Sequence, residues 1–308
     1  MIGLTDQAVL GLRKKAWVMT KQEQIFEEVT ARIINNLESA GSWKRPWGFV
    51  ADGSVPHNAS TGRGYSGINF FNLGFKSQAW GCSGWLTFSQ AKKLGGQVPK
   101  RTDPNGGCEY VVFKSMETAK NKQTGEEEKR FVRKTFPVWN VAQISGLSGL
   151  KKFSPPLPGD GAANALADAV GATVVYGGHN ACFNISKDSI CMPSSAGFVS
   201  PADHDSTLLH ELVHWTGHQE RLARDMSGGF GSDSYAFEEL VAEIGAAMAG
   251  AVLGIHYEGL QHEAYIKSWL TALRGDVALI GKAASLASKA VIFLDDLRGQ
   301  SDAGIEAA

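Results

Sequence analysis

The 308-residue chain has few cysteines and no long apolar run, and each absence narrows the classes of protein to which it can belong. Its four cysteines form no Cys-x-x-Cys pair, so zinc ligation by cysteine is not favoured. No stretch of about 18 apolar residues occurs, which argues against a membrane span, and no basic segment followed by an apolar core opens the chain. The sequence therefore predicts a cytoplasmic protein with reduced thiols and no membrane partner.

A net charge of −1 conceals a division between the two halves of the chain. Residues 1–150 hold 20 lysines and arginines against 12 aspartates and glutamates, a net charge of +8. Residues 151–308 hold 10 against 19, a net charge of −9. Such asymmetry predicts two domains with different partners, the basic one facing a polyanion. The alternative interpretation is an excess of lysine that only keeps a domain soluble.

A proline-rich segment separates these halves. Three prolines within 151–161 resist helix and central strand alike, so we expect a linker there, between domains over 1–150 and 162–308. Apolar periodicity predicts that the first domain contains a helix over 14–38, loops and short strands over 41–74, a short helix over 86–94, and strands over 109–114 and 131–141 around an exposed hairpin loop over 117–130. The second is predicted to contain a helix over 162–170, strands over 172–176, 181–185 and 189–192, and helices over 207–216, 235–253, 262–280 and 282–297. The expected fold class is α+β.

The segment His-Glu-Leu-Val-His at 210–214 has the spacing of a metal site on a helix. His210 and His214 lie four residues apart, so both imidazoles project from one helix face within reach of one cation. Glu211 points toward the same opening and can take a proton from a water at the metal. Zinc is the preferred ion, and another divalent ion such as Mn²⁺ is the alternative. A plain helix with two core-facing histidines is the competing interpretation.

A catalytic zinc needs a third protein ligand, and the sequence offers three sources for it. His218 and Glu220 follow the motif directly, and the predicted helix over 235–253 carries Glu239 and Glu243 on one face among small residues. This helix resembles the third-ligand helix of thermolysin-like peptidases. The resemblance implies Glu239 as the ligand and Glu243 as the partner of a histidine, with an exchange of these two roles left open.

Two further features of a peptidase are expected near this helix. A strand over 188–193 precedes it, at the place where an edge strand of such enzymes pairs with extended substrate, although a purely structural strand explains the pattern equally well. The candidates for an oxyanion donor are Tyr235, His256, Tyr257 and His262.

The basic half combines cations with aromatic side chains, because six of the eight tryptophans lie before residue 150. Bases stack on aromatic rings while cations track phosphates, so this mixture predicts binding of a single strand. A nucleotide-binding P-loop is not expected, because the glycine-rich loop lacks Gly-Lys-Ser/Thr. The candidate nucleic-acid-binding residues are Lys44, Arg45, Trp47, Asn58, Thr61, Arg63, Tyr65, Asn69, Lys92 and Lys93.

An ordered set of motifs over about residues 20 to 297 resembles the ArdC-type antirestriction proteins. The motifs are Trp-Lys-Arg-Pro-Trp at 43–47, Asn-Ala-Ser-Thr-Gly-Arg-Gly-Tyr-Ser-Gly-Ile-Asn at 58–69, Trp-Leu-Thr-Phe at 85–88, His-Glu-Leu-Val-His-Trp-Thr-Gly-His at 210–218 and Tyr-Ala-Phe-Glu-Glu-Leu-Val-Ala-Glu at 235–243. The resemblance implies a single-stranded-DNA-binding domain joined to a zincin-like metallopeptidase domain. It also implies a protein of conjugative plasmids or related mobile elements that protects incoming DNA from host restriction.

Three functions compete on the sequence alone. The first is a DNA-binding antirestriction protein, whose other partner is a protein substrate or a restriction-system component. The second is a dedicated regulatory or toxin-like metallopeptidase, whose N-terminal domain recognises a protein substrate. The third is a DNA-binding module with a purely structural metal. Glu211 argues against the third, because a structural metal needs no general base, and the charge division favours the first over the second.

Overall fold

The structure of the protein is a computed structural model. It describes residues 19–39, 55–100, 102–104, 106–120, 127–151, 161–229, 232–255 and 266–306. Several predicted positions lie outside the described residues, and they are Lys44, Arg45, Trp47, His256, Tyr257, His262 and most of the predicted linker.

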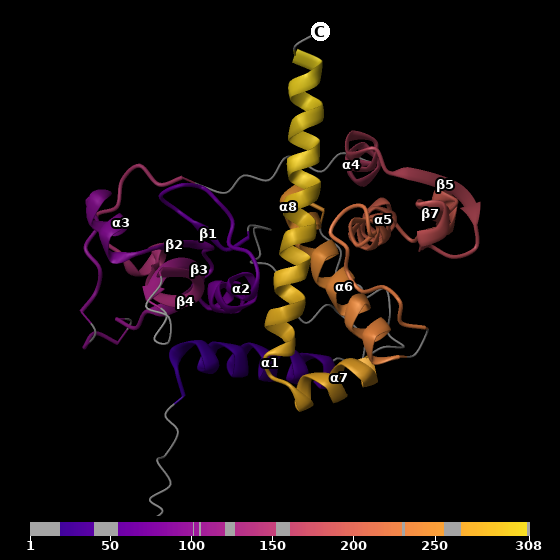
Figure 1. The fold of residues 1–308 in the computed structure, drawn as a ribbon. Helices are drawn as coiled ribbons and strands as arrows, with labels where there is room; N and C mark the ends of the chain where they lie inside the picture. Colours follow the sequence, from indigo (N-terminus) through magenta and orange to yellow (C-terminus); the bar gives the residue numbers. More distant parts are fainter. Residues whose placement is uncertain are drawn as a thin grey trace, which may run out of the picture.

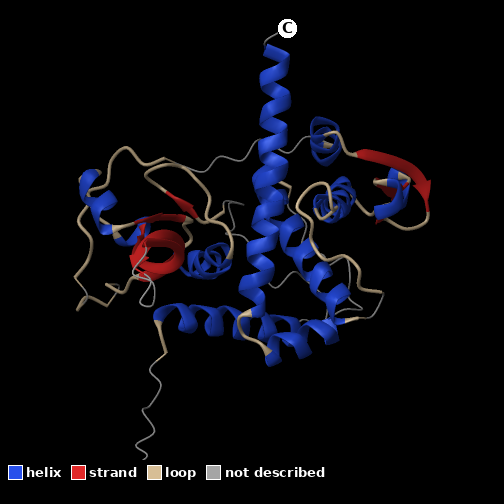
Figure 2. Cartoon of the chain, in the orientation of Figure 1, coloured by secondary structure: helices blue, strands red, loops and turns tan. Residues whose placement is uncertain are grey.

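The basic half forms a small sheet flanked by helices (Figure 1, Figure 2). Its strands are β1 (His57–Asn58), β2 (Gly84–Leu86), β3 (Glu109–Lys120) and β4 (Glu127–Asn140), in the spatial order β1-β2-β4-β3. Its helices are α1 (Lys21–Ser39), α2 (Ile68–Trp80) and α3 (Phe88–Lys93), followed by a short 3-10 turn at Val141–Gln143. The α+β class is confirmed.

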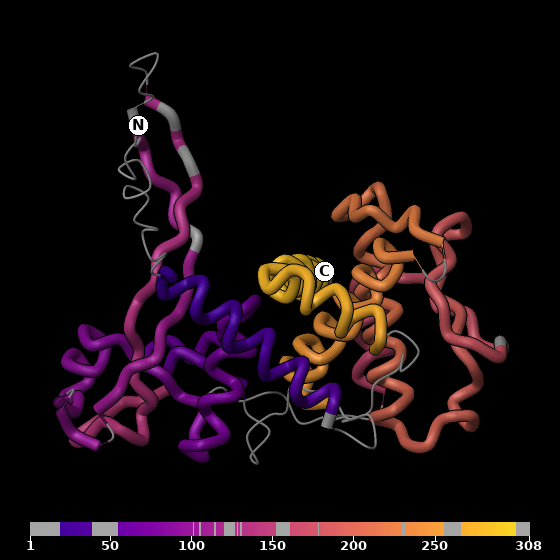
Figure 3. The backbone as a smooth tube through the Cα atoms, turned by 90° about the horizontal axis from the view of Figure 1, so that it is seen from below, coloured from indigo at the N-terminus to yellow at the C-terminus, as the bar shows by residue number. Residues whose placement is uncertain are grey.

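The hairpin of β3 and β4 is longer than the sequence predicts. The residues from Glu117 to Arg130 lack apolar anchors, and we expected them to form a loop. Instead the strands stay paired from Glu109↔Val138 as far as Lys120↔Glu127, so the loop prediction is wrong at both of its ends. Opposite charges support this outer part, because Glu117 lies 2.5 Å from the ammonium of Lys134. Figure 3 shows the hairpin extending away from the other elements.

Helix α2 begins within the segment 41–74, for which we expected only loops and short strands, and continues to Trp80. Asparagine and glycine lower its intrinsic helix propensity, but two asparagines serve the sheet instead. The Asn69 amide receives a hydrogen bond from the backbone N–H of Val112 (2.8 Å) and donates one to its carbonyl (2.9 Å). Asn72 donates to the carbonyl of Tyr110 (2.9 Å). The helix thus satisfies backbone groups along β3, which is the outer strand of this sheet.

The acidic half contains a three-stranded sheet covered by helices. Its strands are β5 (Thr173–Gly178), β6 (Cys182–Asn184) and β7 (Ser189–Pro193), in the order β5-β7-β6, with short 3-10 turns at Ile185–Lys187 and Ser195–Gly197. Its helices are α4 (Ala162–Val170), α5 (Pro201–Thr216), α6 (Asp233–Leu253), α7 (Ile266–Gly275) and α8 (Leu279–Glu306). The helix predicted over 162–170 matches α4 at both ends.

One hydrophobic core joins helices of both halves. It combines Val29 and Ile33 of α1 with Trp269 of α7 and Ala287 of α8, all nearly inaccessible to solvent. In Figure 1 α8 runs between the first sheet and helices α5 and α6, while α1 and α7 lie near its first residues. The domain boundary stays a prediction, but a fragment ending at residue 150 would expose the apolar face of α1.

Among the described residues, no single helix is long and apolar enough to cross a membrane. One bent pair, Ile266–Gly275 with Leu279–Gly299 at 117°, passes that test by length and composition only.

Candidate metal centre

Helix α5 carries the predicted metal motif through the interior of the protein. It begins six residues before the predicted start, because Ser200 caps it by accepting a hydrogen bond from the N–H of Asp203 (3.1 Å) and Pro201 occupies the first turn. Every residue from His204 to Thr216 is buried. The motif therefore lies in surroundings that strengthen electrostatic interactions.

Helix α6 can approach α5 closely because of a glycine. A Cβ atom on Gly245 would lie 2.7 Å and 2.9 Å from the two methyl groups of Val213, closer than real side chains pack. This is the close packing that the small residues of the segment predict. It brings the face of α6 that carries Glu239 to the two histidines of α5.

Three side chains converge between these helices. Nε2 of His210 lies 3.1 Å from Nε2 of His214. The nearest carboxylate oxygens of Glu239 lie 3.3 Å from the former nitrogen and 3.6 Å from the latter. Among the described residues these three form the one group of His, Cys, Asp and Glu side chains with the spacing of a metal site.

The spacing of this group matches what a divalent ion requires. Ligands about 2.1 Å from a tetrahedral ion stand about 3.4 Å from one another. The two nitrogens are 3.1 Å apart, and each has one oxygen of Glu239 near that value, with Oε2 at 3.3 Å from His210 and Oε1 at 3.6 Å from His214. Two imidazoles and a carboxylate are also a donor set that zinc accepts. The residues present therefore fit such an ion.

The surroundings hold an excess of buried negative charge. Glu211, Glu238, Glu239 and Glu243 are each at most 7% exposed. Among the described residues, the cations that offset them are Arg224 and the imidazolium of His214. Uncompensated buried charge is costly, and a dication at the three converging groups would neutralise much of it.

Each histidine also presents its second ring nitrogen to a carboxylate. Nδ1 of His214 lies 3.1 Å from Oε1 of Glu238, and Nδ1 of His210 lies 3.7 Å from Oε1 of Glu243. Such partners fix the orientation and tautomer of metal-binding histidines. The distance from Glu243 is longer than a hydrogen bond, so its role as the partner of a histidine stays a prediction. The role of Glu238 was missed, because nothing in the sequence distinguishes it from a surface glutamate beside Glu239.

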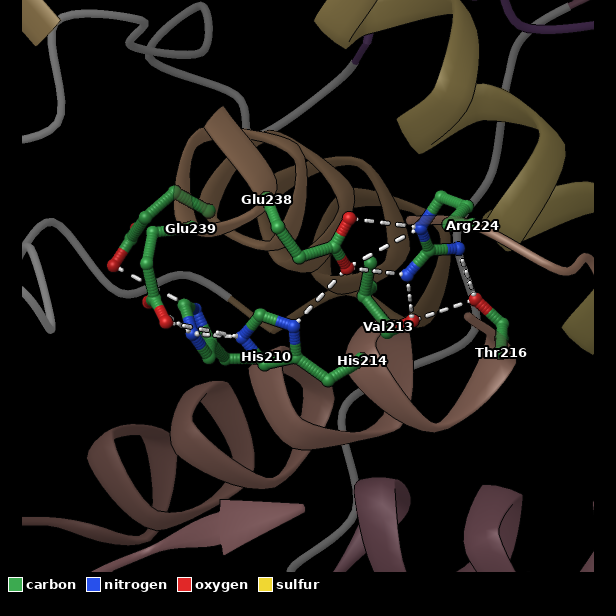
Figure 4. Close-up of polar contacts among 8 residues, drawn as sticks. His210, Val213, His214, Thr216, Arg224, Glu238 and Glu239 are labelled. Atoms are coloured by element: carbon green, nitrogen blue, oxygen red, sulfur yellow. Dashed lines mark hydrogen bonds and ion pairs between the residues drawn. The ribbon is translucent and has the colours of Figure 1, made fainter. Parts of the chain in front are cut away.

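Arg224 holds Glu238 in place from the opposite side (Figure 4). Its guanidinium donates to both carboxylate oxygens of Glu238, at 2.7 Å and 3.0 Å. The same group donates to the Val213 carbonyl (2.6 Å) and to the Thr216 hydroxyl (2.8 Å), both near the end of α5. A chain of contacts therefore runs from Arg224 through Glu238 to His214, and this chain was also missed.

These contacts shift the pKa of each partner. Burial alone would lower the pKa of His214, but hydrogen bonds to Glu238 and Glu239 raise it to about 10. Burial opposes ionisation of Glu238, yet the hydrogen bonds from His214 and Arg224 bring its pKa below the usual value. The pKa of Glu239 is lowered in the same way by both histidines, against the effect of its burial.

Glu211 stands at the wall of a cavity of about 150 Å³ beside the converging groups. Burial raises the pKa of its carboxyl above the ordinary value, although the nearby histidines oppose the shift, and the backbone N–H of Phe183 donates to it. Tyr235, one of the oxyanion candidates, lines the same cavity. The apolar side chains of the wall include Phe183, Ile185 and Met226.

The remaining candidates for the third ligand lie elsewhere. His218 follows the end of α5 and packs edge-on against the ring of Phe183, with centroids 6.4 Å apart. The backbone N–H of Glu220 donates to Nδ1 of His218 (3.3 Å). Neither residue joins the group of His210, His214 and Glu239.

The predicted edge strand is in fact central. Strand β7 pairs with β5 on one side and with β6 on the other, so the expectation that it lies at the edge is wrong. The hairpin that forms β6 covers the side that would have been free. Strand β6 is the outer strand of the described sheet, and its Cys182 and Phe183 line the cavity.

The predicted nucleic-acid contacts are distributed unevenly. Thr61, Arg63, Lys92 and Lys93 are exposed, whereas Asn58 is partly buried and accepts hydrogen bonds from the N–H groups of its own turn. Asn69 is 5% exposed with its amide engaged by β3, so its assignment as a DNA contact is wrong. Its place in a polar loop sequence suggested accessibility, but it begins a buried helix.

Tyr65 belongs to an aromatic cluster on one face of the hairpin. Its ring lies 6.4 Å from that of Phe113, which lies 6.0 Å from that of Phe136. Phe113 and Phe136 are 46% and 42% exposed, which is unusual for two neighbouring phenylalanines. Neither phenylalanine was predicted as a contact, because their alternation with polar residues indicated only a half-buried strand.

Comparisons with known proteins agree with this architecture. Residues 23–143 match the family described as the N-terminal domain of anti-restriction factor ArdC, and residues 161–286 match the zincin-like metallopeptidase family. The metal-free crystal structure of the antirestriction protein ArdC from plasmid R388 is 36% identical, with a TM-score of 0.72, and the match covers 89% of this chain and 98% of that one. Its Mn(II)-bound structure matches with a TM-score of 0.69, at 36% identity, over 89% and 97% of the two chains.

A longer relative contains a similar region. DNA primase TraC of Escherichia coli is 36% identical over 89% of this chain and 27% of its own length, so the chain spans about a quarter of that primase. Fold and comparisons together define a protein with an ArdC-type N-terminal domain and a zincin-like metallopeptidase domain. The chain belongs to the ArdC family of antirestriction proteins.

Proposed function

We propose that this protein binds single-stranded DNA, protects incoming DNA from restriction, and holds a divalent metal ion in a peptidase-type site. The observation that carries the metal site is the convergence of His210, His214 and Glu239 within 3.1–3.6 Å of one another. The Mn(II)-bound structure of the R388 protein supports a divalent ion, and the donor set also suits zinc. The function in antirestriction rests on membership of the family.

The proposed reaction is hydrolysis of a peptide bond in a protein substrate or in a component of a restriction system. A divalent ion supplies a Lewis acid that polarises the substrate carbonyl. Glu211 accepts a proton from the attacking water on its carboxylate and delivers it to the leaving nitrogen. Its burial supports this role, because a raised pKa suits a group that must both take and release a proton near neutral pH. Of the predicted oxyanion donors, Tyr235 is the one that lies among the described residues, and we propose that it stabilises the oxyanion.

Two variants separate the ligands from the base. We expect His210→Ala to lose most of its bound metal, because one of the three donors is gone. Glu211→Gln should keep the metal, because Glu211 is proposed as base and not as ligand. The metal content of each variant after dialysis, measured by inductively coupled plasma mass spectrometry, distinguishes a ligand from a base. Equal metal loss in both variants would overturn the assignment.

The DNA-binding part of the proposal rests on exposed aromatic and basic side chains in the N-terminal half. Phe113 and Phe136 form, with Tyr65, a ring surface on which unpaired bases can stack. Lys134 pairs directly opposite Phe113 on the neighbouring strand, where a cation can meet a phosphate. The name of the family domain that matches residues 23–143 is compatible with this function.

The hairpin offers a matched control for this part. Phe131 is 71% exposed and pairs with Met116, so it points to the opposite face of the same strands. Phe136→Ala should weaken binding of a single-stranded oligonucleotide to the full chain by roughly 1–3 kcal/mol. Phe131→Ala should leave it unchanged. Equal affinities of the two variants, or a preference of the wild type for duplex, would contradict the proposal.

A dedicated metallopeptidase is the second candidate function. The observation that favours it is β6, an outer strand at the cavity that pairs on one side alone among the described strands and can accept an extended peptide on the other. On this view the N-terminal half recognises protein, and Phe136→Ala lowers peptide cleavage without changing affinity for DNA. Measuring both quantities on the same variant separates the two functions.

A further inference from the structure

Two of the four cysteines face each other across the small sheet. Cys182 of β6 lies directly opposite Cys191 of β7 in antiparallel register, so their side chains project from the same face of the sheet. Directly opposed residues of antiparallel strands have Cα atoms about 4.5–5.5 Å apart, which falls within the range for a disulfide. The pair is therefore close enough for a disulfide, although the Cβ atoms, about 4.5–5.5 Å apart in such pairs, must draw together slightly as the S–S bond forms.

This pair lies on the outer face of the sheet. Val175 of β5 is in register with Cys191, and it is 52% exposed, so the row of Val175, Cys191 and Cys182 faces away from the core. The alternate residues, such as Ile190 at 0% exposure, pack toward α5. Cys182 is exposed and Cys191 is partly buried. A small oxidant in solution can therefore reach Cys182 first, with Cys191 poised to react second.

We propose that Cys182 and Cys191 are an oxidisable dithiol, which a hydroperoxide converts into a disulfide that fixes strand β6 beside Glu211. The Cys182 sulfur attacks the peroxide oxygen, becoming a sulfenic acid and releasing water or an alcohol. The Cys191 thiol then attacks that sulfur, forms the S–S bond and releases a second water. Two thiols are oxidised by two electrons and one hydroperoxide is reduced, so the step is balanced.

The consequence follows from the position of β6. This strand has three residues and pairs with β7 alone among the described strands, and the ring of Phe183 packs against His218 and Arg221. Its Phe183 donates the backbone hydrogen bond to Glu211, and the strand lines the cavity. A covalent link at Cys182 restricts the movement of this segment, while His210, His214 and Glu239 keep all their donor atoms. Oxidation therefore changes the wall of the site and leaves metal binding intact.

The reaction should be slow at neutral pH. Partial burial raises the pKa of the Cys182 thiol, and the neighbouring Cys191 and Glu211 act in the same direction. Since the thiolate is the nucleophile, oxidation should accelerate as the pH becomes alkaline. The pair then serves as a threshold response to sustained oxidation and not as a fast sensor.

The experiment treats the metal-loaded full chain with hydrogen peroxide and maps the thiols by peptide mass spectrometry. We expect a linked peptide pair containing Cys182 and Cys191, lighter by two hydrogen atoms and restored by dithiothreitol. The oxidised protein should show slower hydrogen exchange in the β6 peptide, a Tm raised by roughly 5 °C, and unchanged metal content. The double variant Cys82→Ser/Cys108→Ser is the matched control and should behave as the wild type.

Single variants keep the proposal open to refutation. In Cys191→Ser the disulfide cannot form, so dimedone should trap a sulfenic acid on Cys182. The proposal is overturned if no linked peptide forms in the wild type, if Cys82 and Cys108 link instead, or if Cys191→Ser gains the same thermal stability on oxidation. Loss of metal on oxidation would overturn the second part, the claim that only the wall of the site is altered.

Discussion

Glu238→Gln is the change that most directly tests the chain of contacts behind His214. The substitution keeps the shape of the side chain but removes the charge between His214 and Arg224, whose side chains are 10% and 4% exposed. A carboxylate accepts from both neighbours, whereas an amide has one acceptor oxygen and places an NH₂ group against a donor. One of the two contacts must therefore be lost, and Arg224 is left buried without its counterion.

The magnitude follows from this geometry. Breaking a buried ion pair by removal of one partner costs about 3–5 kcal/mol of folding stability. Loss of a carboxylate that orients a metal-binding histidine lowers metal affinity about 10–100-fold, which is about 1.4–2.7 kcal/mol. Urea unfolding of the metal-free protein measures the first quantity, and titration with zinc against a competing chelator measures the second.

Two further variants make this prediction sharp. Glu243→Gln is the matched control, because Glu243 stands 3.7 Å from Nδ1 of His210, beyond normal hydrogen-bond distance, and should affect metal affinity less. Arg224→Lys keeps the charge but loses the bidentate geometry, so its effect should be intermediate. The reasoning fails if folded Glu238→Gln binds zinc as tightly as the wild type, or if Glu243→Gln is the more damaging variant.

Other predictions concern helix packing, acid stability and the sheet edge. Gly245→Ala should lower metal affinity, and overpacking should lower the free energy of unfolding by about 1–3 kcal/mol, more than the gain of about 1 kcal/mol in helix propensity. Adding Val213→Ala should restore both quantities. If urea and zinc titrations show no such rescue, α5 and α6 do not pack as closely as we infer. Hydrogen bonds with Arg221 lower the pKa of Asp188, so its stabilisation is complete above the unfolded value of 3.8 and is lost as the pH falls from that value through the lowered pKa of the folded state. Asp188→Asn should therefore unfold with a weaker acid dependence below about pH 4, and an unchanged urea midpoint profile against pH would refute this. Asn69→Ala should lower the free energy of unfolding by about 1–3 kcal/mol, because it leaves backbone groups of β3 unsatisfied. The folded variant should bind single-stranded DNA normally. Weaker DNA binding without loss of stability would show that Asn69 contacts DNA after all.

The sequence could predict the part of the site that lies on a single helix. The spacing of His210 and His214 places both rings on one face, because helical periodicity is a local property. Glu239 required more, since its approach depends on how α6 packs against α5, and it was selected by resemblance to a third-ligand helix. Gly245 gave an indirect signal of that packing through its small size.

Contacts that depend on tertiary structure could not be predicted from the sequence. Arg224 lies in an irregular segment, and neither its charge nor its position indicates that it would be buried against Glu238. Asn69 illustrates the opposite error, because a polar residue in a glycine-rich stretch was expected at the surface and instead completes the edge of a sheet. The outer half of the hairpin was missed for a related reason, since its stability comes from cross-strand pairs and not from a local apolar pattern.

The interleaving of α1 with α7 and α8 has a thermodynamic consequence for the whole chain. Thr30 of α1 donates to the carbonyl of Val277 (2.9 Å), and the N–H of Gly67 donates to the hydroxyl of Ser288 (2.7 Å). Unfolding of either half therefore removes packing from the other, and both should melt in one transition. A ligand that binds only the folded state adds its binding free energy to that single transition, wherever its site lies. Zinc should then protect the distant hairpin against proteolysis. Bound DNA should in turn slow the loss of zinc that occurs when the protein opens locally. Neither effect requires a conformational change to be transmitted between the two sites.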